Sequence, residues 1–292
     1  MSQFSFVGVG HKGTCLTSED GNRWKQAHEG RDGEILRGVC FGGGRCVAVG
    51  AYGGENIFAV STDGTHWQTE KKDAGYVRFV RTVCFSGGLF FGYGGDGTSV
   101  GSANPFQIHS EDGLKWSDYK EIGGAHLIRR VAFGEGKFVG VGDRGRVSLS
   151  PNGQDNWRDV PNTKALDTFA DVAFGNGVFV GVGLNGLRMK TKDGLTWTDL
   201  QRGEEGEHLN SILFTGKQFV AVGSGVTYFS TDGKQWKRES NHNAPQTATF
   251  GNEIYVGTRW RGRLLLSENA LDWKEGFKCT QPINAVASGL WG

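Results

Sequence analysis

The chain has 292 residues, including 49 Gly and only 5 Pro, together with 19 Phe, 9 Trp and 6 Tyr. This composition favours short strands joined by tight turns over helices. The formal net charge of +1 gives no reason to expect nucleic acid or an anionic membrane as a partner. No apolar run approaches the roughly 18 residues that a membrane span needs. The glycine-rich nucleotide-binding patterns and the G-x-S-x-G hydrolase pattern are also missing, which excludes those classes.

Tryptophan recurs along the chain at intervals of 37 to 49 residues. Each of seven tryptophans ends a short phrase of the type S-x-D-G-x-x-W, such as SEDGNRW at residues 18–24. A second phrase, FVxVG, stands about 15 to 20 residues earlier, and an alternating apolar segment of the type V-x-F precedes it. A repeat of about forty residues is typical of propellers and solenoids. The seven residues are Trp24, Trp67, Trp116, Trp157, Trp197, Trp236 and Trp273.

Each repeat therefore contains four extended segments, which we name strands A to D in chain order. V-x-F is strand A, FVxVG is strand B, strand C precedes the Asp phrase and strand D begins near the Trp. Glycine-rich turns join A to B and C to D, and such turns indicate hairpins. Four antiparallel strands per repeat are typical of a propeller blade. Gly8, Gly140 and Gly181 in strand B predict close approach of a neighbouring backbone.

The two ends of the chain complete one blade. The first repeat has strands B, C and D but no strand A, and residues 283–288 supply a spare strand A. Sharing one blade between the two ends leaves no unpaired edge between the first and last blades. The sequence thus predicts an all-β fold, a seven-bladed β-propeller in which residues 1–292 form a single domain.

The S-x-D-G-x-x-W phrases resemble the Asp boxes of sialidases and other propellers with bacterial neuraminidase repeats. The box of that family has one more residue between Asp and Gly, and the chain has no counterpart of the sialidase FRIP arginine motif. The resemblance implies a secreted or periplasmic protein. The N-terminus does not look like a signal peptide, so a cytosolic location also stays open.

The box residues have a structural explanation. A carboxylate can accept backbone N–H bonds in an Asx-turn, the Gly permits a positive φ, and the Trp fills space between sheets. Asn152 and Asn269 replace the Asp in two repeats, which fits a turn better than a catalytic group. We therefore look for function elsewhere.

Antiparallel strands place the A–B and C–D turns on one face and the B–C and D–A loops on the other. The second set varies in length and character, which suits binding. Its longest B–C loop is residues 94–106, and residues 71–79 form an irregular D–A loop. The residues that begin strand A should line the mouth of the central channel on this face. In the seven repeats they are Arg37, Arg81, Arg129, Ala170, Asn210, Gln246 and Asn284.

Three arginines in successive blades predict a site for a carboxylate, sulfate or phosphate group. Arg130 would add a fourth guanidinium. The alternative is that these arginines pair with local acids, namely Glu34, Asp73 and Asp171. The same face would carry Trp260, which could stack on a sugar ring or simply pack within its loop.

We expect a non-catalytic propeller that recognises a glycan or a protein, because the ring lacks the long inserted loops of most propeller enzymes. An alternative is a glycosidase or lyase acting on an acidic sugar, with Asp96, Asp143, His11 and Tyr52 as catalytic candidates. A third possibility is an assembly-factor scaffold, a role known for an Asp-box propeller. Each acidic or histidine candidate could also be an ordinary surface residue. We expect no cofactor, because the five cysteines show no CxxC spacing and His11 has no metal-site spacing. We expect a monomeric domain that binds no nucleic acid and has no membrane span.

Overall fold

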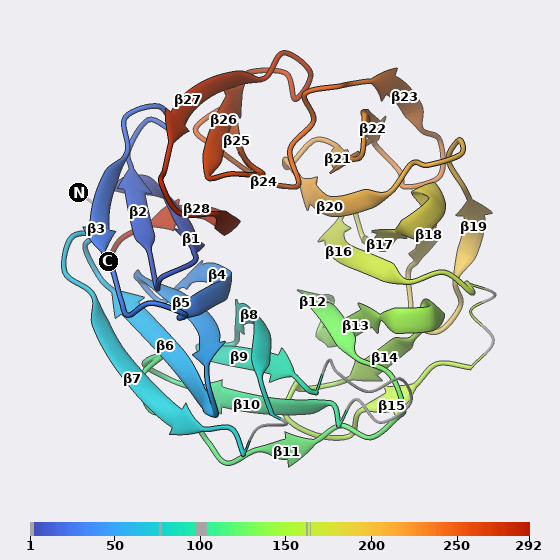
Figure 1. The fold of residues 1–292 in the computed structure, drawn as a ribbon. Helices are drawn as coiled ribbons and strands as arrows, with labels where there is room; N and C mark the ends of the chain where they lie inside the picture. The colour runs from blue at the N-terminus through green and yellow to red at the C-terminus, as the bar shows by residue number, and fades with distance from the viewer. Residues whose placement is uncertain (1–2, 76–77, 97–103, 162, 164) are drawn as a thin grey trace.

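The seven repeats form seven four-stranded antiparallel sheets, arranged as blades around a common axis (Figure 1). The computed structural model describes residues 3–75, 78–96, 104–161, 163 and 165–292. The chain is an all-β seven-bladed propeller, as the repeat pattern predicts.

The strands follow the order A to D from the axis outward. Blade 1 contains β28 (Ile283–Leu290), β1 (Phe4–Gly10), β2 (Cys15–Ser18) and β3 (Lys25–His28). Blade 2 contains β4 (Ile35–Gly42), β5 (Arg45–Tyr52), β6 (Glu55–Ser61) and β7 (Gln68–Asp73). Blade 3 contains β8 (Val80–Ser86), β9 (Leu89–Gly94), β10 (Phe106–Ser110) and β11 (Lys120–Glu121). Blade 4 contains β12 (Ile128–Gly134), β13 (Lys137–Gly142), β14 (Val147–Ser150) and β15 (Arg158–Asp159).

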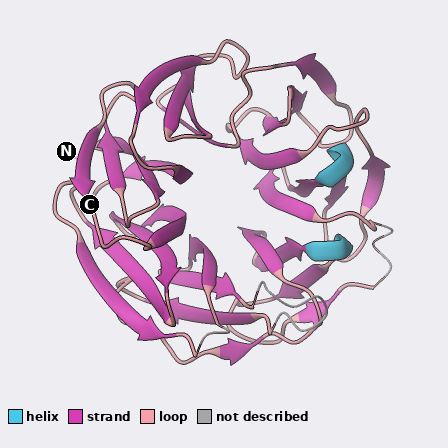
Figure 2. Ribbon diagram, viewed as in Figure 1, coloured by secondary structure: helices cyan, strands magenta, loops and turns pink. Residues whose placement is uncertain are grey.

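The remaining blades follow the same plan. Blade 5 contains β16 (Phe169–Gly175), β17 (Val178–Gly183), β18 (Arg188–Thr191) and β19 (Thr198–Gln201). Blade 6 contains β20 (Leu209–Phe214), β21 (Phe219–Gly223), β22 (Val226–Ser230) and β23 (Lys237–Ser240). Blade 7 contains β24 (Thr247–Gly251), β25 (Ile254–Arg259), β26 (Arg263–Ser267) and β27 (Lys274–Lys278). Two short 3-10 helices, η1 (Asp143–Gly145) and η2 (Leu184–Gly186), lie in the B–C loops of neighbouring blades (Figure 2).

The ring closes through blade 1, as predicted. Strand β28 pairs with β1 from Phe4 opposite Leu290 to Gly10 opposite Ile283. Trp291 then seals the junction between blades 1 and 2. Its indole nitrogen donates to Ser5 Oγ at 2.9 Å, and its ring packs edge-on against Phe41.

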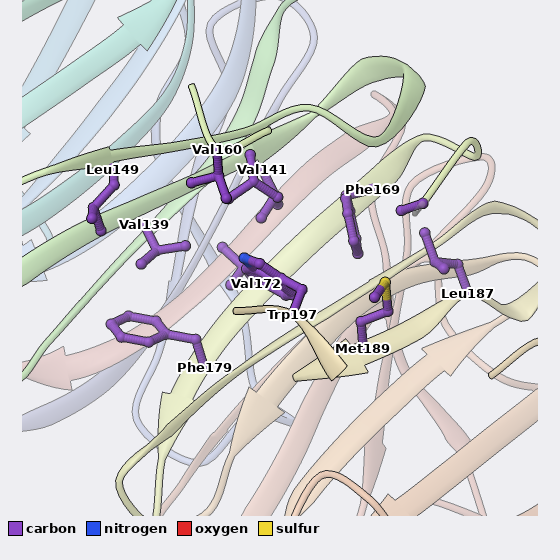
Figure 3. Close-up of a cluster of buried hydrophobic side chains, with 12 residues drawn as sticks. Val139, Val141, Leu149, Val160, Phe169, Val172, Phe179, Leu187, Met189 and Trp197 are labelled. Carbon is purple, nitrogen blue, oxygen red and sulfur yellow. The ribbon is translucent and has the colours of Figure 1, made fainter. Parts of the chain in front are cut away.

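The apolar core consists of clusters between adjacent blades. One cluster joins blades 4 and 5 and includes Val139, Phe169 and Trp197 (Figure 3). The strand-B glycines make room for it: a Cβ at Gly181 would lie 2.9 Å from the Phe169 ring and 3.2 Å from the Trp197 ring. The neighbours of these glycines are therefore side chains, so the predicted close approach of a backbone was wrong in this detail.

The boxes are hydrogen-bonded turns. In blade 5, Oδ1 of Asp193 accepts from the backbone N–H groups of Leu195 and Thr196 at 2.8 and 2.7 Å. The indole N–H of Trp197 donates to Gly194 O at 3.2 Å. The bond from Thr196 N–H lowers the pKa of Asp193 most, and together with the bond from Leu195 N–H it brings that pKa to about 2. Asn152 and Asn269 accept the equivalent backbone bonds in blades 4 and 7, so an amide oxygen suffices for the turn.

One predicted loop is shorter than expected. Residues 71–79 do not form a continuous D–A loop, because β7 extends through Asp73. It does so because β6 offers a long partner strand, with Glu55 opposite Asp73 and Ile57 opposite Lys71.

Candidate functional site

The residues predicted to line the end of the axis share one backbone feature, a β-bulge. In blades 2, 3 and 4 the pairing between strands A and B skips Arg37, Arg81 and Arg129, respectively. The same shift occurs at Ala170, Asn210 and Asn284. A bulge bends its strand and changes the direction of a side chain. Six of the seven blades thus use the same local device at the position that the sequence singled out.

The final Gly of the FVxVG phrase makes this bulge possible. A Cβ at Gly142 would lie 1.8 Å from the carbonyl oxygen of Leu127, and one at Gly94 would lie 1.9 Å from that of Phe79. No side chain fits at that distance. Blade 7 has Thr258 at this position, and its strands pair without a register shift. The final Gly of strand B therefore occurs together with the bulge at the first residues of strand A.

The three arginines form a cluster at the start of strands β4, β8 and β12, which we call the arginine cluster (Arg37, Arg81 and Arg129). Arg81 is half-buried. Burial lowers the pKa of Arg81, and repulsion from Arg37 and Arg129 lowers it further. Like charges on three adjacent blades are therefore close enough to interact, and such a cluster favours an anion.

Two of the acidic candidates lie beside this cluster. Electrostatic attraction to Asp96 and Asp143 raises the pKa of Arg81. Arg129 Nε donates to Asp143 Oδ1 in a short ion pair. Arg81 Nε makes a long hydrogen bond of 3.4 Å to Gly95 O. The two carboxylates thus offset part of the positive charge, and Asp143 is held by Arg129.

Two of the acids that the sequence offered as alternative partners, Glu34 and Asp171, make ion pairs with other arginines than the three of the cluster. Glu34 pairs with Arg31 at 2.9 Å. Asp171 is partly buried, and desolvation raises the pKa of its carboxyl, which accepts Ile212 N–H of the next blade at 2.9 Å. Asp171 lies 3.9 Å from Arg130 rather than beside the arginine cluster. Within the described part of the chain, no carboxylate lies within ion-pairing distance of Arg37 or Arg81.

The amide candidates differ from one another. Asn284 Nδ2 donates to Leu36 O at 2.8 Å, which links blade 1 to blade 2. Gln246 is exposed, and its backbone N–H extends the pairing of blade 7 by donating to Thr258 O at 2.7 Å. Asn210 is half-buried at its bulge. A binding role for all three stays a prediction.

The remaining candidates lie on the same face at different distances from the axis. His11 is near Arg37: burial lowers the pKa of the imidazole, and repulsion from Arg37 lowers it further. Tyr52 instead stacks under Arg31, whose guanidinium carbon lies 4.9 Å from the ring centre. Trp260 is at the tip of the β25–β26 hairpin and is 65% exposed. The structure thus places His11 within electrostatic range of Arg37, whereas Tyr52 contacts Arg31.

Buried polar side chains hold the loops of this face, and sequence reasoning missed them. Arg146 donates to Gly123 O at 2.7 Å and to His126 O, which fixes the D–A loop of blade 3. Arg188 is only 4% exposed and donates to Gly186 O and Arg202 O at 2.8 and 3.1 Å. Asn56 is fully buried and bonds to Arg78 O and Val80 N–H. A polar residue at the start of strand C was the available signal.

The described residues contain no group of three His, Cys, Asp or Glu side chains placed to hold a metal ion. Across the ranges that the structure describes, no helix combines the length and apolarity needed to cross a bilayer.

Comparison with solved structures places the chain among β-propellers. The structure "YCF48 bound to D1 peptide" superimposes with a TM-score of 0.62 at 16% identity, covering 94% of this chain and 87% of that one. The WD40 β-propeller domain of Doa1 gives 0.59 at 14% identity, covering 90% and 85%. The computationally designed protein Ika8 gives 0.53 at 12% identity, covering 83% and 76%. No protein-family model and no curated protein sequence matches the chain. At these identities the likeness shows a shared β-propeller fold, and the resemblance of the turns to Asp boxes stays a resemblance in sequence.

Proposed function

We propose that this chain is a non-catalytic interaction propeller that binds an anionic group of a protein partner at the arginine cluster. The observation that carries the proposal is that Arg37, Arg81 and Arg129 occupy equivalent bulges of three successive blades, with Arg37 and Arg129 both within electrostatic range of Arg81. A cluster of this kind costs free energy in the isolated chain, and an anion between the guanidinium groups would offset that cost.

The surroundings of the cluster support a preformed site. Arg146 and Arg188 donate hydrogen bonds to backbone carbonyls of the loops on this face. Because these loops are already held in place, little conformational entropy is lost when a partner binds. A protein with the same fold, YCF48, has been solved with a bound D1 peptide. That precedent favours a peptide or protein partner over a glycan.

Asp96 and Asp143 support a second candidate function, a hydrolase or lyase acting on an acidic sugar. Both carboxylates act on Arg81, and an acidic sugar held by the arginines would lie near them. A hydrolase or lyase would need one of them free to exchange a proton, whereas Asp143 already accepts from Arg129. We therefore place the enzyme second.

The test is a binding screen by fluorescence anisotropy with acidic peptides, sialyllactose and uronate oligosaccharides. It compares the native chain with Arg81→Gln and with Arg202→Gln, a control on the same face whose guanidinium is paired with Asp167 at 2.7 Å. We expect an acidic peptide to bind the native chain and the control, and Arg81→Gln to weaken binding about tenfold or more. Binding that is equal in all three proteins would contradict the proposal. Conversion of a saccharide in the same samples would favour the enzyme.

A further inference from the structure

Four B–C hairpins on the binding face share a two-residue turn with a rare backbone. In blades 1, 4, 5 and 7, a Gly with φ between 58° and 73° follows a non-Gly residue that also has a positive φ. These non-Gly residues are Lys12 (56°), Arg144 (52°), Asn185 (57°) and Arg261 (67°). Two successive residues with positive φ match a type I′ turn, which favours Asn-Gly.

Three of the four turns use a long cation where Asn would be easier. Asn tolerates the left-handed region, whereas a Lys or Arg side chain is strained there. Asn185 shows that this fold accepts the preferred residue. Strained backbone positions persist mainly where the side chain serves a function. A cation at such a turn that makes no ion pair within the described part of the chain therefore suggests a contact outside the chain.

Two of the three cations are available for a partner. Lys12 pairs with Glu29 at 2.6 Å and Asp32 at 3.5 Å. Arg144 and Arg261 are exposed, and neither has a carboxylate within ion-pairing distance among the residues that the structure places. They lie on blades 4 and 7, outside the arginine cluster.

Exposed apolar residues occur in or next to each of these two turns. Arg144 N–H donates to Thr168 Oγ1, and Leu184 N–H donates to Thr168 O at 3.0 Å, so both turns adjoin the loop that carries Leu166. Leu166 is 82% exposed and Leu184 is 38% exposed. Arg261 directly follows the exposed Trp260 in its hairpin.

The loop that carries Leu166 is anchored. Ala165 is buried in the cluster between blades 4 and 5, and a Cβ at Gly145 would lie 1.8 Å from Ala165 O. Thr163 Oγ1 donates to Gly145 O at 3.1 Å. Thr163 and Ala165 thus hold the backbone close to Leu166, whose side chain is largely exposed.

We infer that Arg144 and Arg261, with Leu166, Leu184 and Trp260, form two outer contacts for an acidic segment of a protein that also carries apolar side chains. This rests on the proposed binding role of the same face. The pairing of each cation with an apolar neighbour favours a protein over a polyanion such as nucleic acid, because a phosphate backbone offers nothing to a leucine. Arg and Trp are also the residues that most often dominate protein interfaces.

The experiment uses fluorescein-labelled 15-residue peptides in which Asp alternates with Leu, measured by fluorescence anisotropy. Two matched peptides replace Asp by Asn or Leu by Ser, and a 20-residue oligothymidylate serves as a polyanion without apolar groups. The variants are Arg144→Asn, Arg261→Asn and Leu166→Ser. Lys12→Asn is the matched control, because it makes the same turn change at a cation that is already paired.

We expect Arg144→Asn and Arg261→Asn each to weaken binding of the Asp–Leu peptide about fivefold. We also expect each to raise Tm by about 2 °C, because Asn relieves the strain. A purely structural arginine would lower Tm instead. Lys12→Asn should leave the affinity within about twofold, and Leu166→Ser should weaken the Asp–Leu peptide but not the Asp–Ser peptide.

Several results would overturn the inference: unchanged affinity in both arginine variants, a lower Tm in either, equal binding of the Asp–Ser peptide or the oligothymidylate, or no binding of any peptide. If Arg81→Gln abolishes peptide binding while Arg144→Asn and Arg261→Asn do not change it, the arginine cluster binds the partner and the outer contacts do not exist. The two proposals can thus fail separately.

Discussion

Asp143 forms an ion pair with Arg129 of its own blade and also attracts Arg81 of the preceding blade electrostatically. One carboxylate therefore offsets the charge of two members of the arginine cluster. It would also compete with any anion that a partner brings to the cluster.

We expect Asp143→Asn to strengthen binding of an acidic peptide severalfold, because the variant removes a competing negative charge. The affinity should also fall more steeply as salt is added, because more of the cluster's charge is exposed to the ligand. Asp167→Asn is the control, since Asp167 pairs with Arg202 elsewhere on this face. Anisotropy titrations at several salt concentrations would check this, and a loss of affinity in Asp143→Asn would show that Asp143 orients Arg129 rather than competing.

Substitution of the final strand-B glycine should show how tightly the bulge is specified. Gly142→Ala places a methyl group against Leu127 O and should lower the free energy of unfolding by about 3 kcal/mol. Gly216→Ala is the control: its φ is +86°, but no atom lies within 4 Å of an added Cβ. Backbone strain alone should cost about 1 kcal/mol there. Chemical denaturation would measure both, and equal losses would contradict the steric account of the bulge.

The box carboxylates should make the fold sensitive to acid. The pKa of Asp193 is about 2 in the folded chain, below its ordinary value of 3.8. Because the folded pKa is depressed, the stabilisation is complete above about pH 4 and is lost as the pH falls toward 2. Asp193→Asn keeps the acceptor oxygen, as in Asn152, so we expect a loss of only about 2 °C in Tm at pH 7. The difference in Tm between the two proteins should shrink between pH 5 and pH 2, and a constant difference would contradict the assignment.

The anchor of the blade 5–6 loop depends on Tyr228. Its hydroxyl donates to Glu207 Oε2 at 2.7 Å, and its ring lies 3.9 Å from the guanidinium carbon of Arg188. We expect Tyr228→Phe to lower the free energy of unfolding by about 1 to 2 kcal/mol, because Glu207 is buried and loses a donor. Tyr228→Leu should cost more, since it also removes the aromatic face under Arg188. Denaturant titrations would compare the three proteins, and a neutral Tyr228→Phe would mean that Arg238 satisfies Glu207 alone.

The fold could be predicted from the sequence because each blade repeats the same local signals. The box Trp, the final Gly of strand B and the spare strand at residues 283–288 all lie where the repeat requires them. The position of the arginine cluster also followed, because strand A begins at the same point in each repeat. The predicted alternative, pairing with local acids, holds for Arg130, which pairs with Asp171. The partner of Arg129 is Asp143, which lies in a B–C loop that is close in space but fourteen residues away in the sequence.

Other features depend on contacts between blades that a repeat pattern does not contain. Phe133 is 43% exposed, whereas Phe174 and Phe214 are half-buried. The reason is one residue in the preceding blade. Gly134 of blade 4 leaves room for Phe174, and Gly175 of blade 5 leaves room for Phe214. The equivalent residue of blade 3, which faces Phe133, is Ser86. The left-handed turn at Arg144 was visible in the sequence as a residue followed by Gly after strand B. Only the structure gives its positive φ and the exposed leucine beside it.

The most direct test of the central claim is an NMR titration of the arginine side chains. The chain would be labelled with ¹⁵N-arginine, and the Nε–Hε signals followed as the Asp–Leu peptide is added. The account predicts saturable shifts of the Arg37 and Arg81 signals, assigned through Gln variants, while the buried Arg188 stays unchanged. Shifts confined to arginines outside the cluster, with Arg37, Arg81 and Arg129 unaffected at saturation, would contradict the claim that the partner binds there.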